Sequence, residues 1–376
     1  MTAGAAAIDH VHMARALQLA ARGTYSTAPN PAVGCVMLDA SGAVAGEGWH
    51  HRAGQPHAEV YALHAASVRA RGGTVYVTLE PCSHLGRTPP CADALIVAGV
   101  RRVVAAMQDP NPRVAGDGLR SLEAAGIVTA VGVLERAARE LNRGFVSRMT
   151  RGRPWVTVKL GSSVDGRTAL ADGSSQWITS EAARADVQRL RARASAIVTG
   201  IGTALADDPA LTVRDGTLDL GGRVPLRVVL DSRGRLEPDL KLARDGLPTL
   251  VFTSAAGARA LARLMDAEPA GLQVEAVAVD DAGRIELDAT LRHLAALECN
   301  EVLVEAGPRL AGSFLAAGLA DEIVLYVAPA ILGDTAQPSF ILPHALRVLA
   351  ERPLYSYHDV RRVGADLRLA LRPVET

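Results

Sequence analysis

The residues of this chain best suited to chemistry are His57, Cys82 and Cys91, with Glu59 close by. One imidazole and two thiolates suit Zn²⁺, and a site with three protein ligands leaves its fourth tetrahedral position to water, as catalytic zinc sites do. Glu59 follows His57 by two residues at an expected helix start, so we expect its carboxylate to carry protons for that water and not to bind the metal. The pattern predicts a hydrolytic zinc site with Glu59 as its catalytic acid and base.

Three expected elements position these side chains. A helix over residues 57–71 begins at His57, a buried strand over 75–79 leads into Glu80-Pro81-Cys82, and a helix over 91–98 begins at Cys91. His-x-Glu together with Pro-Cys in this context is the signature of the zinc nucleobase deaminases. The chain differs from the simple C-x-x-C spacing, because residues 83–90 separate its two cysteines.

Strands and helices alternate along the rest of the chain. The first half has the pattern of a helix ending before Gly23, a hairpin over 33–38 and 44–48, a strand over 102–106 and helices over 118–125 and 134–149. In the second half, strands are expected over 155–160, 196–199, 226–230, 249–253, 301–305 and 322–329. This alternation predicts an α/β protein with largely parallel sheets, covered on both faces and bearing sites at the carboxyl ends of strands.

Length and composition indicate an ordinary enzyme. A chain of 376 residues suggests about two domains, and the turn-rich residues 150–154 favour a division into residues 1–148 and 149–376. Lys plus Arg equals Asp plus Glu, 40 against 40, which argues against nucleic acid or a membrane surface as partner and favours a small-molecule substrate. Without a basic N-terminal region, an apolar membrane span or a disulfide framework, we expect a cytoplasmic protein. We also expect a homo-oligomer.

A second candidate site lies at Val304–Ala311, where an expected strand breaks at Gly307 and a helix restarts with Pro308 in its first turn. Backbone N–H groups at such a turn can hold a phosphate. On its own this signal is weak, since strand-glycine-helix junctions are common. The chain contains no G-x-G-x-x-G, which argues against a Rossmann-type dinucleotide site.

Five segments together resemble the bifunctional deaminase/reductases of riboflavin biosynthesis. They are PNPAVGC (29–35), GQPHAE (54–59), EPCSHLGRTPPC (80–91), DPNP (109–112) and LADDPALTVR (205–214). Residues 236–300 hold no matching segment. The resemblance implies a cytidine-deaminase-like α/β/α sandwich followed by a dihydrofolate-reductase-like α/β domain. It further implies zinc-dependent deamination of a phosphorylated diaminopyrimidinone, then NADPH-dependent reduction of the product.

The resemblance also assigns site residues. In the deaminase half it implies substrate contacts at Asn30, His50 and Arg87. In the reductase half it implies substrate contacts at Ser175, Arg191, Leu211, Arg214 and Glu305, and cofactor contacts at Ser162, Trp177, Thr203, Asp207, Ser232 and the turn Gly307, Pro308, Arg309, Leu310, Ala311 and Gly312.

Roles for some charged residues follow from the reductase chemistry. Arg191 and Arg214 suit a substrate phosphate, and Lys159 and Asp207 are the candidates for proton handling. Arg233 or Arg235, just past the strand ending at Asp231, could meet the cofactor's 2′-phosphate and so favour NADPH.

Two other interpretations stay open at this level. A nucleoside or tRNA deaminase fused to an unrelated domain would share His-x-Glu and Pro-Cys, although the neutral charge and the long cysteine insert argue against it. A non-catalytic, zinc-stapled binding module would need a fourth protein ligand, such as His84, and would leave Glu59 without a role.

Overall fold

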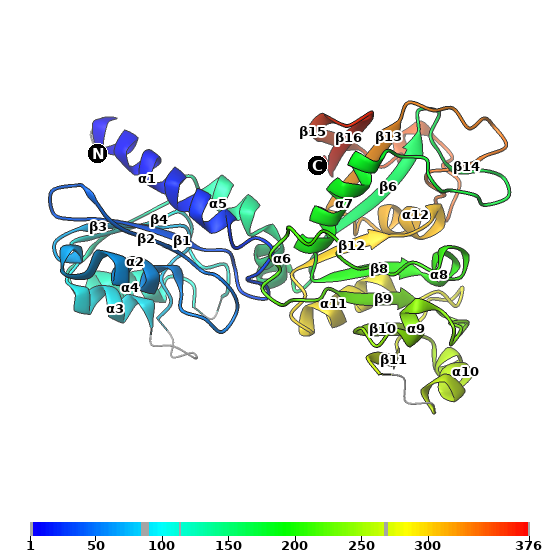
Figure 1. Ribbon diagram of the computed structural model, residues 1–376, viewed down its shortest axis with the longest axis horizontal. Coiled ribbons are helices and arrows are strands. Elements are labelled where there is room, and N and C mark those ends of the chain that lie inside the picture. The colour runs from blue at the N-terminus through cyan, green and yellow to red at the C-terminus, as the bar shows by residue number, and fades with distance from the viewer. Residues whose placement is uncertain (1–2, 84–89, 113, 267–269, 375–376) are drawn as a thin grey trace. The chain divides into compact units, whose positions relative to one another are not determined.

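The computed structural model describes residues 3–83, 90–112, 114–266 and 270–374 of the chain (Figure 1). It divides into two compact units, residues 1–152 with 219–223, and residues 153–218 with 224–376. Each unit has its own sheet and its own buried apolar core. Among the described residues, no helix is both long and apolar enough to cross a membrane.

The first unit is built on a five-stranded mixed sheet in the order β2-β1-β3-β4-β5. Strand β1 runs antiparallel to β2 and β3, whereas β3, β4 and β5 are parallel. The expectation of a largely parallel sheet therefore holds only for the last three strands, because the β1–β2 hairpin reverses the chain. The elements are α1 (Ala3–Ala21), β1 (Gly34–Leu38), β2 (Val44–Trp49), α2 (Ala58–Ala66), η1 (Ser67–Ala70), β3 (Thr74–Val77), α3 (Cys91–Ala98), β4 (Arg102–Ala105), α4 (Asp117–Ala124), β5 (Val128–Val131), α5 (Glu135–Leu141) and α6 (Arg143–Arg151).

Glycines let two helices lie close to this sheet. A Cβ atom on Gly34 would come within 2.0 Å of the carbonyl oxygen of Ala16 in α1, and one on Gly46 within 2.3 Å of that of Ala62 in α2. A Cβ atom on Gly48 would lie 2.4 Å from the carbonyl oxygen of Ala58, also in α2. Successive residues of a strand point to opposite faces of the sheet. Gly48 is paired with Cys35, the residue after Gly34, so Gly48 and Gly34 point to opposite faces. Helices α1 and α2 therefore cover opposite faces, and the glycines of β2 fix the start of α2 beside the predicted metal site.

The second unit holds a nine-stranded sheet in the order β11-β10-β9-β8-β12-β6-β13-β16-β15. All pairings from β11 to β13 are parallel, and only the last two strands are antiparallel. The carboxyl ends of seven strands therefore lie along one edge. The elements are β6 (Trp155–Ser163), β7 (Arg167–Ala169), α7 (Glu181–Arg193), β8 (Ala196–Gly200), α8 (Ile201–Asp207), β9 (Leu226–Leu230), α9 (Lys241–Arg244), β10 (Thr249–Thr253), α10 (Ala255–Met265), β11 (Leu272–Ala276), α11 (Leu287–Ala296), β12 (Glu301–Glu305), α12 (Pro308–Ala316), β13 (Glu322–Ala328), β14 (Gln337–Pro338), η2 (Leu349–Glu351), β15 (Tyr355–Val363) and β16 (Asp366–Pro373).

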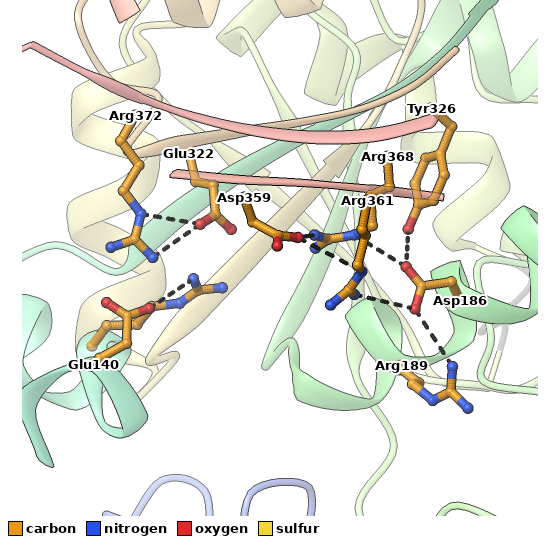
Figure 2. A network of polar contacts seen from close by, with 10 residues as sticks. Glu140, Asp186, Arg189, Glu322, Tyr326, Asp359, Arg361, Arg368 and Arg372 are labelled. Carbon is orange, nitrogen blue, oxygen red and sulfur yellow. Dashed lines mark hydrogen bonds and ion pairs between the residues drawn. The ribbon is translucent and has the colours of Figure 1, made fainter. Parts of the chain in front are cut away.

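A buried polar network ties the C-terminal hairpin to α7 (Figure 2). The hydroxyl of Tyr326 in β13 donates to Asp186 of α7 at 2.6 Å, and the guanidinium of Arg368 in β16 lies 3.1 Å from the same carboxylate. Arg368 also donates to Asp359 of β15 at 3.0 Å. A carboxylate buried this deeply is stabilised only when such partners surround it, so Asp186 ties α7 to β13 and β16.

Candidate active sites

The three predicted metal ligands meet at one point of the first unit. The donor atoms of His57, Cys82 and Cys91 all lie within 4.8 Å of one another. Nδ1 of His57 is 3.3 Å from Sγ of Cys91 and 3.5 Å from Sγ of Cys82. His57 is the N-cap of α2 and Cys91 is the first residue of α3, so two helix starts and the exit of β3 build the cluster.

The electrostatics of the cluster favour a cation. The hydrogen bond from Cys91 lowers the pKa of Cys82 to about 4, whereas the same contact and burial raise the pKa of Cys91. Without a cation, only one of two touching thiols can readily ionise, because a second thiolate would repel the first. A zinc ion supplies the charge that allows both to bind as thiolates.

Glu59 lies beside this cluster in the first turn of α2 and is only 3% exposed. Burial raises the pKa of its carboxyl to about 7, and the nearby His57 opposes that rise. Its Oε2 atom is buried and has no hydrogen-bond partner among the described residues. A buried oxygen without a partner is costly, and water at the open position of a three-ligand zinc site would provide one. The residues present therefore fit a catalytic zinc ion.

Two of the three expected deaminase substrate residues join this site. His50 is 2% exposed, and its ring lies 5.5 Å from that of His57, edge to face. Nδ1 of His50 is 3.0 Å from the carbonyl oxygen of Pro56, and its Nε2 is 3.1 Å from the amide nitrogen of Asn30. The carbonyl requires an N–H on Nδ1, so Nε2 accepts from Asn30. Arg87 and the alternative ligand His84 lie outside the described residues.

Sequence reasoning missed the role of Glu80, which precedes Pro81-Cys82. Its side chain is buried, and its two oxygens accept backbone N–H groups from Asp109 (3.0 Å), Gly116 (2.9 Å), Gly118 (2.9 Å) and Leu119 (3.3 Å). The carboxylate thus fixes Asp109 and residues 116–119 against the strand exit that carries Cys82. No sequence motif predicts this role of Glu80, because all four hydrogen-bond donors are backbone N–H groups.

A large cavity lies at the carboxyl edge of the sheet of the second unit, with a volume of about 1910 Å³. Most of the expected reductase residues line it: Lys159, Ser175, Trp177, Arg191, Thr203, Asp207, Leu211, Arg214, Ser232, Glu305, Gly307, Pro308, Arg309 and Leu310. Three do not. Ser162 and Ala311 are buried, and Gly312 packs so closely that a Cβ would lie 2.0 Å from the carbonyl oxygen of Ile341.

A charged cluster forms one wall of this cavity. Glu305 ends β12 and receives both arms of the Arg191 guanidinium, at 2.6 and 3.0 Å. Nζ of Lys159 lies 3.8 Å from the same carboxylate. Burial opposes ionisation of Glu305, but Arg191 and Lys159 outweigh it and lower its pKa. Arg214 is exposed, and its backbone N–H donates to Gln188 at 2.8 Å.

The turn into α12 differs in detail from the expected phosphate cradle. The N–H of Gly307 is not free, because it donates to the hydroxyl of Thr203 at 3.0 Å, and Pro308 has no N–H. The backbone N–H groups of Arg309 and Leu310 are those left in the first turn to meet an anion. Sequence reasoning also missed Arg184, whose guanidinium lies 4.4 Å from the ring centre of Trp177 in the same cavity.

Comparisons with known proteins agree with this geometry. Residues 7–107 match the family model of the cytidine and deoxycytidylate deaminase zinc-binding region, and residues 154–367 match that of the RibD C-terminal domain. The riboflavin biosynthesis protein RibD of Escherichia coli K12 is 47% identical over 96% of this chain and 99% of its own. The RibD of Haemophilus influenzae is 45% identical over 97% of each chain.

Solved structures show the same likeness along nearly the whole chain. RibD of Acinetobacter baumannii superposes with a TM-score of 0.90 and 43% identity, covering 98% of this chain and all of its own. A Thermotoga maritima deaminase/reductase superposes with a TM-score of 0.83 and 32% identity, covering 98% and 99%. Fold and site thus define a zinc-binding deaminase domain joined to a dihydrofolate-reductase-like reductase domain. The chain belongs to the RibD family of bifunctional deaminase/reductases of riboflavin biosynthesis.

Proposed function

We propose that this chain deaminates 2,5-diamino-6-(5-phosphoribosylamino)pyrimidin-4-one in its first unit and, in its second, reduces 5-amino-6-(5-phosphoribosylamino)uracil with NADPH. The observation that carries the proposal is the His57, Cys82 and Cys91 donor set with the partnerless Glu59 oxygen beside it. Support for the substrates comes from the Thermotoga maritima relative, whose name states a diaminohydroxyphosphoribosylaminopyrimidine deaminase and a 5-amino-6-(5-phosphoribosylamino)uracil reductase.

For the first step, zinc held by His57, Cys82 and Cys91 would lower the pKa of water so that hydroxide can add to the ring carbon bearing the amino group. Glu59 accepts the proton that this water loses and returns it to the leaving amine, which departs as ammonia. Asn30 orients the pyrimidine. Its amide nitrogen donates to His50, which leaves its carbonyl oxygen to accept an N–H of the ring.

For the second step, NADPH would supply a hydride to C1 of the ribose in its open-chain imine form. Arg214 binds the ribose phosphate, since it is the exposed guanidinium next to the Glu305 cluster. Lys159 is the stronger candidate for giving a proton to the imine nitrogen as the hydride reaches C1, because it already lies against Glu305 in the cavity wall. Asp207, an exposed residue of the cavity lining, is the alternative.

Three broader expectations accompany this function. We propose residues 1–148 and 149–376 as the deaminase and reductase domains, with the short segment 219–223 packing as part of the first compact unit. A cytoplasmic location and a homo-oligomeric state stay predictions.

The direct test is to incubate the whole protein with the diaminopyrimidinone, with and without NADPH, and to identify the products by mass. Without NADPH, the product should have exchanged an amino group for oxygen, with release of ammonia. With NADPH, that product should gain two hydrogens. Consumption of NADPH without prior release of ammonia would contradict the proposed order.

A further inference from the structure

A loop of the first unit leads from α1 to β1 and carries Asn30, the expected contact of the pyrimidine. This 22–33 loop is described throughout, and its residues form no helix or strand. Near β1 it is held by Asn142, whose side chain accepts the N–H of Ala32 at 2.8 Å and donates to the carbonyl oxygen of Ala32 at 2.9 Å. The part of the loop before Asn30 needs a partner of its own, because ordering an irregular segment costs conformational entropy.

That partner is a segment from the later half of the sequence, Asp219–Arg223, which belongs to the first compact unit. Nη1 of Arg223 donates to the carbonyl oxygen of Tyr25 at 2.5 Å. Gly221 lies against the next residue of the loop, since a Cβ on this glycine would come within 2.9 Å of the Cβ of Ser26. A hydrogen bond from a charged donor is stronger than a neutral one, so the segment fixes the loop at Tyr25 and Ser26.

The segment has a shape that its own sequence determines. Oδ1 of Asp219 accepts the N–H of Gly221 at 2.8 Å. The N–H of Arg223 donates to the carbonyl oxygen of Leu220 at 3.1 Å. Gly221 and Gly222 have φ of +62° and +85°, a backbone conformation that glycine adopts without steric cost. The segment is therefore preorganised to hold the loop.

The contact at Ser26 connects to the expected substrate residue along two routes. The hydroxyl of Ser26, which is 6% exposed, donates to the carbonyl oxygen of His51 at 2.5 Å, next to His50. The N–H of Asn30 donates to the carbonyl oxygen of Thr27 at 2.9 Å, and its amide nitrogen lies 3.1 Å from Nε2 of His50. A displacement of Ser26 is therefore transmitted to Asn30 from both sides. Misplacement of a positioning group by about 1 Å can lower a rate by roughly 10²-fold.

We infer that Asp219–Arg223 positions the 22–33 loop for deamination, with Arg223 and Gly221 as the positioning residues. This inference rests on the proposed deamination, in which Asn30 orients the pyrimidine. Arg214 lies earlier in the same connection, residues 208–225 between α8 and β9. One connection of the chain therefore carries a predicted substrate contact of the reductase and the support of the deaminase loop.

The test is Arg223→Ala in the whole protein, assayed for ammonia release from the diaminopyrimidinone and for reduction of pre-deaminated substrate. The kcat/KM of deamination should fall by about tenfold or more, the effect of losing a hydrogen bond from a charged group, with zinc content and reduction unchanged. In an Asn30→Ala background the same change should have less than about a twofold effect, because Arg223 acts through Asn30. Arg223→Lys should restore part of the activity, and Arg259→Ala, at an exposed position of α10, should behave as wild type.

Two adjacent glycines provide a matched pair of variants. Gly221→Ala and Gly222→Ala both place a Cβ at positive φ, but a Cβ on Gly222 would have no described atom within 4 Å, whereas one on Gly221 would meet Ser26. Gly221→Ala should therefore lower deamination more than Gly222→Ala does. Equal losses in the two variants would overturn the contact with Ser26 as the cause.

Hydrogen exchange separates this inference from the proposed function. Backbone N–H groups of the 22–33 loop should exchange faster in Arg223→Ala than in wild type, and those of α3 at the same rate. Unaltered exchange in the loop, wild-type deamination by Arg223→Ala, or a further fall of about tenfold in the Asn30→Ala background would overturn the inference. A wild-type protein that releases no ammonia would instead refute the proposed function, and the exchange rates would still decide whether the segment holds the loop.

Discussion

Arg191 and Glu305 form a two-armed ion pair in the wall of the reductase cavity, with Nε–Oε1 and Nη2–Oε2 distances of 2.6 and 3.0 Å. The remaining arm of Arg191 donates to the carbonyl oxygen of Thr212 at 2.9 Å. Three of the five N–H groups of Arg191 are therefore engaged within the protein, and two remain for another acceptor. Arg191 thus holds Glu305 in the cavity wall, and Arg191 and Arg214 both line the cavity and both stay predicted contacts of the substrate phosphate.

Replacing Arg214 by Ala should therefore raise the KM of the reductase for its phosphorylated substrate by about tenfold or more and change kcat less. The phosphate contact exists in both the ground state and the transition state, so its loss weakens binding uniformly. Steady-state reduction of pre-deaminated substrate by the whole protein measures this.

Two further variants control that measurement. Arg214→Lys should restore only part of the affinity, because a point charge cannot replace a planar two-armed contact. Arg259→Ala, at an exposed position of α10 outside the cavity, should behave as wild type. An unaltered KM in Arg214→Ala would remove this residue from the site.

Replacing Cys91 by Ser should abolish zinc binding and deamination, because three donors within 4.8 Å form the described ligand set and a hydroxyl is a poor substitute for thiolate. Cys35→Ala is the matched control. Cys35 is also buried but lies in β1 outside that set, so its variant should keep about one zinc per chain. Metal analysis with ammonia release checks both. A Cys91→Ser protein that retained stoichiometric zinc would contradict the ligand assignment.

The pairing of Asp9 with Arg102 predicts a pH-dependent stability of the first unit. The Arg102 guanidinium donates to both carboxylate oxygens, at 2.7 and 2.8 Å, and lowers the pKa of Asp9 below its usual value of 3.8. A carboxyl group whose pKa is lower in the folded state than in the unfolded state stabilises the fold at every pH above its unfolded-state pKa. This stabilisation is lost as the pH falls through the folded-state pKa.

Asp9→Asn should therefore lower the stability of this unit by roughly 2–4 kcal/mol at pH 7, and the gap to wild type should begin to narrow below about pH 4. Calorimetric unfolding across pH 3 to 7 measures the gap. Asp93→Asn, at an exposed position of α3, should stay within about 0.5 kcal/mol of wild type. If the stability difference between Asp9→Asn and wild type did not change with pH, the charge of the Asp9 carboxylate would not be the source of the stabilisation.

Much of this architecture could be predicted from the sequence where patterns are local. Strands were expected over 226–230, 249–253 and 301–305, and β9, β10 and β12 have those bounds. Helix α3 likewise spans the expected residues 91–98. The expected helix over 57–71 instead ends at Ala66 and continues as a 3₁₀ turn to Ala70. Element ends depend on packing as well as on residue type.

The features that could not be predicted depend on long-range contacts. Strand β15 gave no strand signal, because it is an edge strand with mostly exposed charged and polar residues, and buried partners such as Asp186 hold it from another part of the chain. Strand β16 alternates polar and apolar residues, so its pattern is local, and its strand was nonetheless not predicted. The role of Glu80 also depends on a long-range contact and could not be predicted. The groups that it binds are backbone N–H groups from the later part of the chain, such as those of Asp109 and Gly118.

The metal ligands were predictable because residue type and spacing together specify zinc chemistry. The partners of Arg191 could not be foreseen, since Glu305 and Thr212 come from distant segments.

We expect this chain to hold two chemically separate sites, with Glu59 acting as a proton carrier in only one of them. The most direct measurement is the Glu59→Gln variant of the whole protein, assayed for zinc content, for ammonia release from the diaminopyrimidinone, and for reduction of pre-deaminated substrate. We predict about one zinc per chain, a fall in deamination of roughly 10²-fold or more, and unchanged reduction. Loss of the zinc would make Glu59 a ligand, and an equal fall in both activities would contradict the separation of the two sites.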